Sequence, residues 1–391
     1  MNSSQQFDFD TPIDRRGTSS EKWIGYEDRD VIPMWLADMD FRSPPAVIEA
    51  LHRRVDHRVF GYTAVPEELI QVVLSMLRTT YQWNVEREWL VWLPSLVTGI
   101  NLACRALTED GDDILTAIPV YPPFLSAPEN ARRNLIRVPL VQEAGRWVFD
   151  PDRLKKAITP RTRLFLLCSP HNPVGRAYSR DELAEIAGLC ESHDIMICSD
   201  EIHCGLVLDP EKPHVPTATL DPDVAARTVT LMAPTKTFNL PCLGCAFAIV
   251  PNPELRSRFQ SAKAGLVPAI TALALTAATA AYRDGEEWHA ALLDYLRGNR
   301  DILTRAVNAM PGLSMPHVEA TYIAWIDTRA SDIADPVKFF EAAGVGLGNG
   351  EAFGSPGFVR LTFGCPRATL LTAIGRMERA VPAYARKEPP G

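Results

Sequence analysis

Four apolar, strand-like segments of this chain each run into a polar residue of a kind that takes part in covalent or acid–base chemistry. The segments are 113–120, 164–169, 195–199 and 228–232, and the residues that follow them are Tyr121, Asn172, Asp200 and Lys236. In an open parallel sheet, ligands bind at the carboxyl ends of the strands. These four residues at four strand ends therefore predict one shared site.

Lys236 is the lysine best placed to act as a nucleophile, because it closely follows an apolar strand and has hydroxyl-bearing neighbours. The sequence places the other lysines in polar loops, on helix surfaces or in the tail: Lys22, Lys155, Lys156, Lys212, Lys263, Lys338 and Lys387. A lysine desolvated at a strand end has a lowered pKa, so its neutral amine can attack a carbonyl group. The alternative is an ordinary lysine whose ammonium reaches water from the strand end.

A Schiff-base lysine with an aspartate partner indicates pyridoxal 5′-phosphate as the cofactor. Asp200 would keep the pyridine nitrogen protonated, which makes the ring an electron sink. Asn172 and His203 could hydrogen-bond to the phenolic oxygen, and Tyr121 could stack on the ring. A lone Asp or His at a strand end is more often a cap or a turn former, so it is the joint pattern that favours a site.

The phosphate group of such a cofactor needs a helix N-terminus, where backbone N–H groups are free to bind an anion. A turn followed by a helical pattern predicts a helix over 98–107. Val97, Thr98 and Gly99 are therefore the expected phosphate contacts.

Apolar strands alternate with amphipathic helices through the middle of the chain. Two further strands are predicted at 135–140 and 244–250, and a helix over 180–193 begins at a capping box formed by Ser179 and Glu182. Continuously apolar strands separated by helices are typical of a parallel sheet covered on both faces. The predicted fold class is α/β, with a large domain built on a mostly parallel sheet flanked by helices.

From about residue 251 helices dominate, and the pattern predicts a smaller C-terminal α+β domain. The expected helices are 253–263, 267–283, 286–310, 335–343 and 367–381, and the expected strands are 320–327 and 358–363. Helix starts are also marked at Ser43-Pro44 and at Pro66-Glu67. The predicted division is an N-terminal arm over 1–43 that packs with the small domain, a large cofactor-binding domain over 44–284 and a small domain over 285–391.

The composition is that of a folded, mildly acidic protein: 391 residues, 46% hydrophobic, with 40 basic and 48 acidic side chains and a net charge of −8. Nucleic acid binding needs a basic face, so it is not expected. The first residues lack a signal pattern, and 265–282, rich in Ala and Thr, is interpreted as a buried helix rather than a membrane span. Eight cysteines, with one CxxC at Cys242 and Cys245, predict no metal site and indicate the reducing cytoplasm.

Several segments resemble fold-type-I pyridoxal-phosphate enzymes of the aspartate aminotransferase superfamily: SPHNPVG (169–175), SDEIH (199–203), PTKTFNL (234–240) and FVRLTFG (358–364). Others resemble its PatB/MalY-type cystathionine β-lyase branch: WLADMDF (35–41), FGYT (60–63), PVYPPF (119–124) and GCPR (364–367). His203, where most aminotransferases carry tyrosine, favours the same branch. The resemblance covers nearly the whole chain, and the motifs occur in the expected order.

The resemblance implies a role for each residue of the predicted site. Lys236 would bond to the cofactor and transfer the Cα proton, with Tyr121 stacking on the ring and assisting. Asp200 would pair with the pyridinium nitrogen, and Arg360 would clamp the substrate carboxylate. The resemblance also implies that Asn172 and His203 contact the phenolic oxygen, and that the phosphate is held by Val97, Thr98, Gly99 and Thr235. It implies that Tyr62 contacts the phosphate of the neighbouring subunit, and that the substrate is contacted by Trp35, Ala37 and Asn172. Tyr62 in that role implies a homodimer with shared active sites.

The expected reaction is α,β-elimination, in which cystathionine or a related cysteine S-conjugate yields pyruvate, ammonia and a thiol. An aminotransferase acting on an amino acid and a 2-oxo acid uses the same residues and stays an alternative, as does a cofactor-binding regulatory protein. Ala233 and Gly244 stand where many relatives carry Ser and a phosphate-binding Arg, and the phosphate loop reads PSLVTG without the usual Gly and Pro. These departures weaken the case for the individual phosphate contacts, and the identity of the thiol that leaves the substrate stays open.

Overall fold

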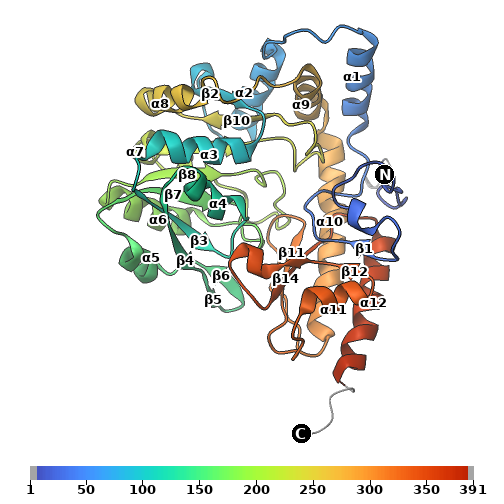
Figure 1. Cartoon of the computed structure of the whole chain (residues 1–391). Helices are drawn as coiled ribbons and strands as arrows, with labels where there is room; N and C mark the ends of the chain where they lie inside the picture. The colour runs from blue at the N-terminus through green and yellow to red at the C-terminus, as the bar shows by residue number, and fades with distance from the viewer. Residues whose placement is uncertain (1–6, 386–391) are drawn as a thin grey trace.

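The computed structural model describes residues 7–385 and is built around a seven-stranded sheet (Figure 1). Its strand order is β2-β10-β9-β8-β7-β3-β4, and only β10 runs antiparallel to its neighbours. The strands are β2 (Leu90–Leu93), β3 (Asp113–Ile118), β4 (Asn134–Pro139), β7 (Thr162–Cys168), β8 (Met196–Asp200), β9 (Thr228–Met232) and β10 (Ala246–Ile249). This mostly parallel sheet confirms the predicted α/β class.

The sheet is buried on both faces because helices cover both. One face packs against α3 (Leu96–Leu107), α4 (Pro123–Asn130) and α8 (Pro253–Lys263), and the other against α2 (Glu67–Tyr81), α5 (Pro151–Ala157), α6 (Arg180–Ser192), α7 (Pro222–Ala226) and α9 (Ala272–Asp284). Successive side chains of a strand point to opposite faces. Leu166 of β7 therefore joins the α3 cluster, while Leu167 joins the α6 cluster. The continuously apolar strand sequences follow from this double burial.

The C-terminal part forms a second layer beside this sheet (Figure 1). It contains α10 (Glu286–Ala309), α11 (Pro336–Ala342), α12 (Arg367–Ala385) and an antiparallel sheet of β11 (Ile323–Asp327), β14 (Phe358–Thr362) and β13 (Gly348–Asn349). β1 (Ile32–Pro33) pairs in parallel with β12 (Val345–Gly346), so the N-terminal segment joins this layer. The other elements are α1 (Pro45–Asp56), which packs on α9, and a hairpin of β5 (Val141–Glu143) and β6 (Arg146–Val148). The domain boundaries stay a prediction.

Helix capping explains where the predicted boundaries hold and where they move. The capping box is confirmed, because the Ser179 side chain accepts the Glu182 N–H and the Glu182 side chain accepts the Ser179 N–H. The helix predicted over 267–283 begins only at Ala272, because Thr271 caps it. The sequence patterns did not predict several short elements, namely the strands β2, β5 and β6 and the helices α4, α5 and α7. None of the helices within residues 7–385 has the length and apolar composition needed to cross a membrane.

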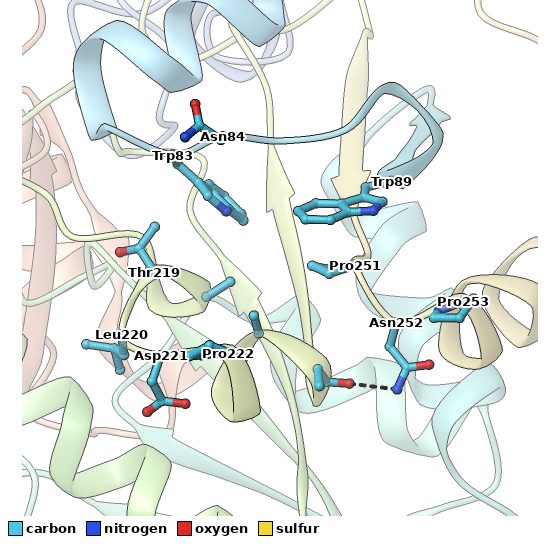
Figure 2. Close-up of a pocket in the computed structure, with 13 residues that line it drawn as sticks. Trp83, Asn84, Trp89, Thr219, Leu220, Asp221, Pro222, Pro251, Asn252 and Pro253 are labelled. Atoms are coloured by element: carbon cyan, nitrogen blue, oxygen red, sulfur yellow. Dashed lines mark hydrogen bonds between the residues drawn. The ribbon is translucent and has the colours of Figure 1, made fainter.

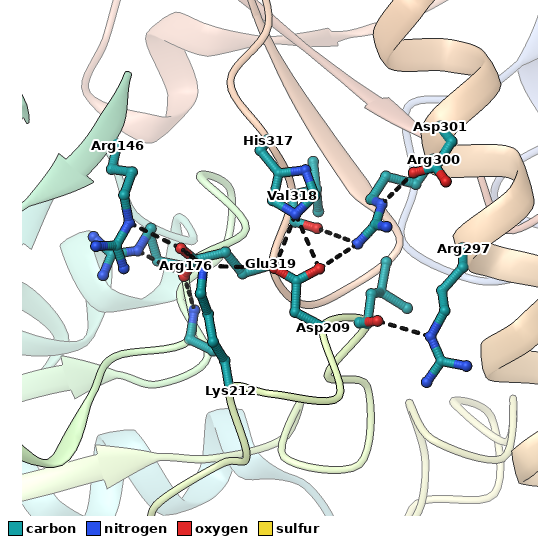
Figure 3. A network of polar contacts seen from close by, with 12 residues as sticks. Arg146, Arg176, Asp209, Lys212, Arg297, Arg300, Asp301, His317, Val318 and Glu319 are labelled. Atoms are coloured by element: carbon teal, nitrogen blue, oxygen red, sulfur yellow. Dashed lines mark hydrogen bonds and ion pairs between the residues drawn. The ribbon is translucent and has the colours of Figure 1, made fainter. Parts of the chain in front are cut away.

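A buried ion network joins the loop that follows β7 to the segment that precedes β11 (Figure 3). Arg176 donates through Nε to Glu319 at 2.8 Å and through Nη2 to Glu182 at 2.7 Å. Glu319 also accepts Arg146 Nε at 3.0 Å and Lys212 Nζ at 2.9 Å. Although burial raises the pKa of the Glu319 carboxyl, its contacts with Lys212 and Arg176 outweigh that effect and lower the pKa to about 2. The network thus holds the loop that carries Asn172 against the C-terminal layer.

Replacing Arg176 by Met should lower the free energy of unfolding at pH 7 by about 3 kcal/mol or more, because it leaves two carboxylates short of a buried partner. Urea denaturation measures the change. Lys338→Met, which breaks the exposed Lys338–Asp335 pair, is the control and should cost less than about 1 kcal/mol. Equal losses in the two variants would contradict the role given to the network.

The same comparison has a predicted pH dependence. The folded-state pKa of Glu319 is depressed, so its stabilisation is complete above the unfolded carboxyl pKa of about 4.3 and is lost as the pH falls toward 2. The difference between the wild type and Arg176→Met should therefore shrink below about pH 4.

Candidate active site

A cavity of about 250 Å³ lies where β3, β7, β8 and β9 end. Among its lining residues are these predicted site residues: Ala37, Val97, Tyr121, Asn172, Asp200, His203, Thr235, Lys236 and Arg360. Strand ends of one parallel sheet meet at one edge, which is why residues so far apart in sequence converge. Thr98, Gly99, Tyr62 and Trp35 are not among the lining residues.

Lys236 lies in the loop after β9 and points its amine into the cavity. Its Nζ donates to the carbonyl oxygen of Ala37. Burial and, after it, the charge of Arg360 lower the pKa of the Lys236 amine to about 8, against the opposing charges of Asp38 and Asp200. About a tenth of the amine is therefore neutral at pH 7, far more than for an ordinary lysine, and the neutral form is the one that acts as a nucleophile or a base.

Asp200 is the last residue of β8 and is only 4% exposed. One carboxylate oxygen accepts the Ile202 N–H at 3.0 Å. Burial raises the pKa of its carboxyl to about 7. Within residues 7–385, no salt bridge contains Asp200, so its charge lacks a close cation. A protonated ring nitrogen of a ligand would supply one.

Arg360, on β14, brings a buried guanidinium to the cavity and is 5% exposed. Its Nη2 donates to the Trp35 carbonyl at 2.7 Å and its Nη1 to Asn172 Oδ1 at 3.4 Å. Its Nε has no partner, and burial lowers the pKa of Arg360 to about 10. The guanidinium also lies 4.6 Å from the centre of the Phe353 ring. A buried guanidinium whose protein partners are carbonyl oxygens fits a carboxylate from a ligand.

Tyr121 and His203 line the same cavity from two different strand ends. The backbone N–H of Tyr121 donates to the Asn172 carbonyl at 3.1 Å, which ties these two loops together. Burial raises the pKa of the Tyr121 hydroxyl, and the Asp200 charge adds to that effect. Burial lowers the pKa of His203 to about 3, so its imidazole is neutral, and its Nδ1 has no partner. An unpartnered ring nitrogen at this wall is available to a polar atom of a ligand.

The phosphate end of the predicted site differs from the expectation. Helix α3 begins at Leu96, not at residue 98, because Ser95 is its N-cap and accepts the Thr98 N–H at 3.1 Å. The Gly99 N–H bonds to the Ser95 carbonyl at 3.3 Å, so the backbone N–H groups of Thr98 and Gly99 are already engaged, and phosphate contacts from these two residues stay a prediction. The first free N–H groups of the helix are those of Leu96 and Val97.

Gly99 has a packing role between α3 and the sheet. A Cβ on Gly99 would lie 2.8 Å from a methyl carbon of Leu231 on β9. Glycine at this position lets α3 approach the sheet closely. The helix N-terminus consequently faces the cavity beside the strand ends.

Tyr62 and Trp35 are not brought to the cavity as side chains. Tyr62 is fully exposed in the loop after α1. The Trp35 indole donates to the Lys22 carbonyl at 3.2 Å, so its side chain packs against the N-terminal segment. Trp35 contributes its backbone carbonyl, which accepts from Arg360.

The sequence did not predict two polar side chains that contact the segment around Ala37. The Tyr322 hydroxyl donates to the Ala37 carbonyl at 2.9 Å, beside the amine of Lys236. Lys22 was assigned to a polar loop or the surface, yet it is 1% exposed, and this prediction is wrong. Its Nζ lies 2.7 Å from Asp40 Oδ2. The pair of acidic residues in the WLADMDF segment could have indicated a buried cation, because buried carboxylates need cations nearby.

A larger cleft of about 710 Å³ lies elsewhere, between α2, α7 and the start of α8 (Figure 2). Trp83, Trp89 and several prolines line it, and Asp221 is its one charged lining residue. The Asp221 carboxylate accepts the Val224 N–H at 2.8 Å and caps α7. The one charged side chain of this cleft is therefore engaged as a helix cap, and the smaller cavity at the strand ends is the candidate active site.

Comparisons with known proteins agree with this geometry. The family model for aminotransferase class I and II matches residues 29–377. The cystathionine beta-lyase PatB of Bacillus subtilis (strain 168) is 35% identical, with 95% of this chain and 99% of PatB covered. The crystal structure of OvoB has a TM-score of 0.94 and 47% identity, covering 96% of this chain and 99% of that chain. The structure of cystalysin from Treponema denticola, which contains pyridoxal 5′-phosphate, has a TM-score of 0.92 and 31% identity, covering 97% and 99%.

The charges around Lys236 predict opposite effects of two substitutions on its pKa. Arg360→Met should raise the pKa above about 8, because it removes a nearby positive charge, whereas Asp200→Asn should lower it, because it removes a negative one. Carbon-13 NMR titration of cofactor-free protein labelled at the lysine ε-carbon measures both shifts, with Lys236→Ala identifying the signal. Shifts in the same direction would contradict the assigned charges.

Proposed function

Because this chain belongs to the aminotransferase class I and II family, we propose that it is a pyridoxal 5′-phosphate-dependent carbon–sulfur β-lyase. It cleaves cystathionine or another cysteine S-conjugate to pyruvate, ammonia and a thiol. One observation carries the proposal: a single cavity holds a buried guanidinium without a carboxylate partner, a buried carboxylate without a cation and a buried lysine of lowered pKa. The relatives named as cystathionine β-lyases support the substrate class.

The residues of the cavity fit the cofactor. Bound pyridoxal phosphate supplies an electron sink for the charge left on Cα when its proton is removed. Asp200 holds the pyridine nitrogen in its protonated form, which also provides the missing partner for the buried carboxylate. The Asn172 amide and the His203 imidazole would hold the phenolic oxygen, and Tyr121 would stack on the ring. The free N–H groups of α3 and the Thr235 hydroxyl would hold the phosphate.

Arg360 and Lys236 act on the substrate. Arg360 binds its carboxylate, using the Nε that has no other partner, and so fixes the orientation of Cα. The Lys236 amine accepts the Cα proton, because its lowered pKa brings the neutral form within reach near neutral pH, and then protonates the departing sulfur. Burial of both side chains excludes water from the proton transfer.

The first test is the release of pyruvate from L-cystathionine without an added 2-oxo acid. Wild-type protein should form pyruvate and ammonia in equal amounts, and Lys236→Ala should lose at least about 10²- to 10⁴-fold of that rate, because the acid–base group is gone. A coupled lactate dehydrogenase assay measures the product. Amino-group transfer that requires a 2-oxo acid, with no pyruvate, would instead establish an aminotransferase.

We further propose a homodimer in which Tyr62 reaches the cofactor phosphate of the partner subunit. Exposed apolar side chains lie along α1 and the loop after it: Ile48, Val55, Val59, Phe60 and Tyr62. Arg54 supports this loop, since its Nη1 donates to the Val59 carbonyl at 2.9 Å. Covering such a patch with a second copy removes apolar area from water, and it brings Tyr62 to another subunit's cavity.

Mixed dimers test the shared site. Tyr62→Ala and Lys236→Ala homodimers should both be impaired, whereas purified mixed dimers should regain about half of the wild-type activity, because one of their two sites then has both native residues. Coexpression with two affinity tags provides the mixed species. Mixed dimers of Tyr62→Ala with a Tyr62→Ala/Lys236→Ala double variant are the control. Equal activity in both preparations would overturn the shared site.

We also assign the enzyme to the cytoplasm. All eight cysteines are free thiols, and six of them are buried. Burial raises the pKa of Cys168 and Cys198, which makes these thiols unreactive. Unpaired thiols in this number suit a compartment kept reducing by glutathione and thioredoxin.

A further inference from the structure

One segment outside the helices and strands touches both cations of the cavity, Lys236 and Arg360. This segment, residues 34–41, follows β1 and is called the strap below. The strap carbonyl of Trp35 accepts Arg360 Nη2 at 2.7 Å. The strap carbonyl of Ala37 accepts Lys236 Nζ and, at 2.9 Å, the Tyr322 hydroxyl. The position of the strap therefore sets the position of both cations.

The strap is fixed at each end by hydrogen bonds from the same structural elements. Near its start, the Thr362 N–H and hydroxyl donate to the Met34 carbonyl at 2.8 and 3.1 Å. Near its end, the Asn239 amide accepts the Met39 N–H and donates to the Met39 carbonyl, both at 3.0 Å. Thr362 lies two residues after Arg360, and Asn239 three residues after Lys236. Thr362 is thus on the same strand as Arg360, and Asn239 is in the same loop as Lys236, so each cation lies on an element that also anchors the strap.

An ion cluster holds the part of the strap next to Ala37. Lys22 Nζ lies 2.7 Å from Asp40 Oδ2 and donates to the Asp38 backbone carbonyl at 3.2 Å. Arg15 pairs with Asp38 at 2.6 Å and with Asp40 at 2.7 Å. The ammonium of Lys22 is therefore bonded to the residue that directly follows Ala37. Met39, between the two aspartates, packs in the core with Phe41.

Stability alone is a weak reason for this cluster. Burying a lysine and a carboxylate costs desolvation energy, and apolar residues of similar volume often stabilise a fold as well or better. What an ion cluster adds is a defined geometry for the groups it bonds. Here those groups are the backbone atoms beside the carbonyl that accepts Lys236.

We propose that Lys22 is a positioning residue for the β-lyase reaction: through Asp40 and the Asp38 carbonyl it fixes the strap, and the strap aligns Lys236 for proton transfer and Arg360 for carboxylate binding. This inference rests on the proposed function for the identity of the reaction. Lys22 itself does not line the cavity. Its effect on catalysis is transmitted by the Ala37 and Trp35 carbonyls.

The central variant is Lys22→Met, which keeps the length of the side chain and removes its charge. After correction for bound cofactor, kcat should fall and KM should rise, each by about tenfold or more, because both cations lose alignment. Asp40→Asn should give the same two changes, and the double variant should add little to either. Lys338→Met, which breaks an exposed pair, is the matched control and should leave kcat and KM unchanged.

Two further readouts do not depend on turnover. The affinity of the holoenzyme for 2-aminoisobutyrate, which has no Cα proton, follows from the visible absorbance of the bound cofactor and should weaken about tenfold in Lys22→Met. In cofactor-free protein, Lys22→Met should raise the pKa of Lys236, because the negative charge of Asp38 then acts on Lys236 without the nearby positive charge of Lys22. The charges of Asp200 on β8 and Arg360 on β14 still face Lys236. The carbon-13 NMR titration described above measures that pKa.

Lower thermal stability with unchanged kcat, KM, ligand affinity and Lys236 pKa would overturn the proposal and leave the cluster a purely structural one. If Lys22→Met does not fold, Arg15→Met decides the question by the same measurements, because Arg15 bonds to the same two aspartates from a more exposed position. If the wild type forms no pyruvate, the proposed function fails. Ligand affinity and the Lys236 pKa then still decide the role of Lys22.

Discussion

The active site depends on charges that the fold buries without pairing them. Asp200 forms no salt bridge and Arg360 has no carboxylate partner in the part of the chain that the structure describes, although both are almost inaccessible to water. Such groups lower stability unless a ligand supplies the opposite charge. A cofactor with a basic ring nitrogen and a substrate with a carboxylate meet these two needs at once. The same burial lowers the pKa of Lys236 to about 8, which brings its neutral form within reach near neutral pH.

The architecture places these charges with two different sheets. Asp200 ends β8 and Lys236 follows the neighbouring parallel strand β9, whereas Arg360 lies on β14 in the C-terminal layer. The two layers are joined by the Arg176–Glu319 network on one side and by the strap on the other. The distance between Arg360 and Lys236 is thus a property of the interface between the layers. In the proposed reaction, that interface would couple substrate recognition by Arg360 to proton transfer by Lys236.

Much of the site could be predicted from sequence, because strand patterns and the chemistry of strand ends are local. The positions of Tyr121, Asn172, Asp200 and Lys236 after apolar segments sufficed to predict a shared cavity, and the cavity contains all four. The phosphate end was predicted less well. Ser95 caps α3 and shifts its start by two residues, which moves the free N–H groups from Thr98 and Gly99 to Leu96 and Val97.

Hydrophobic periodicity and residue chemistry are encoded locally, so the α/β class and the set of strand-end residues could be read from the sequence. Tertiary contacts bury Lys22 and bring the Trp35 and Ala37 carbonyls to Arg360 and Lys236, while the exposed Tyr62 side chain does not line the cavity. The contacts of the two carbonyls join residues far apart in the sequence, such as Trp35 with Arg360. Backbone carbonyls take part in them, and a carbonyl has the same chemistry in every residue, so no residue type marks it in advance.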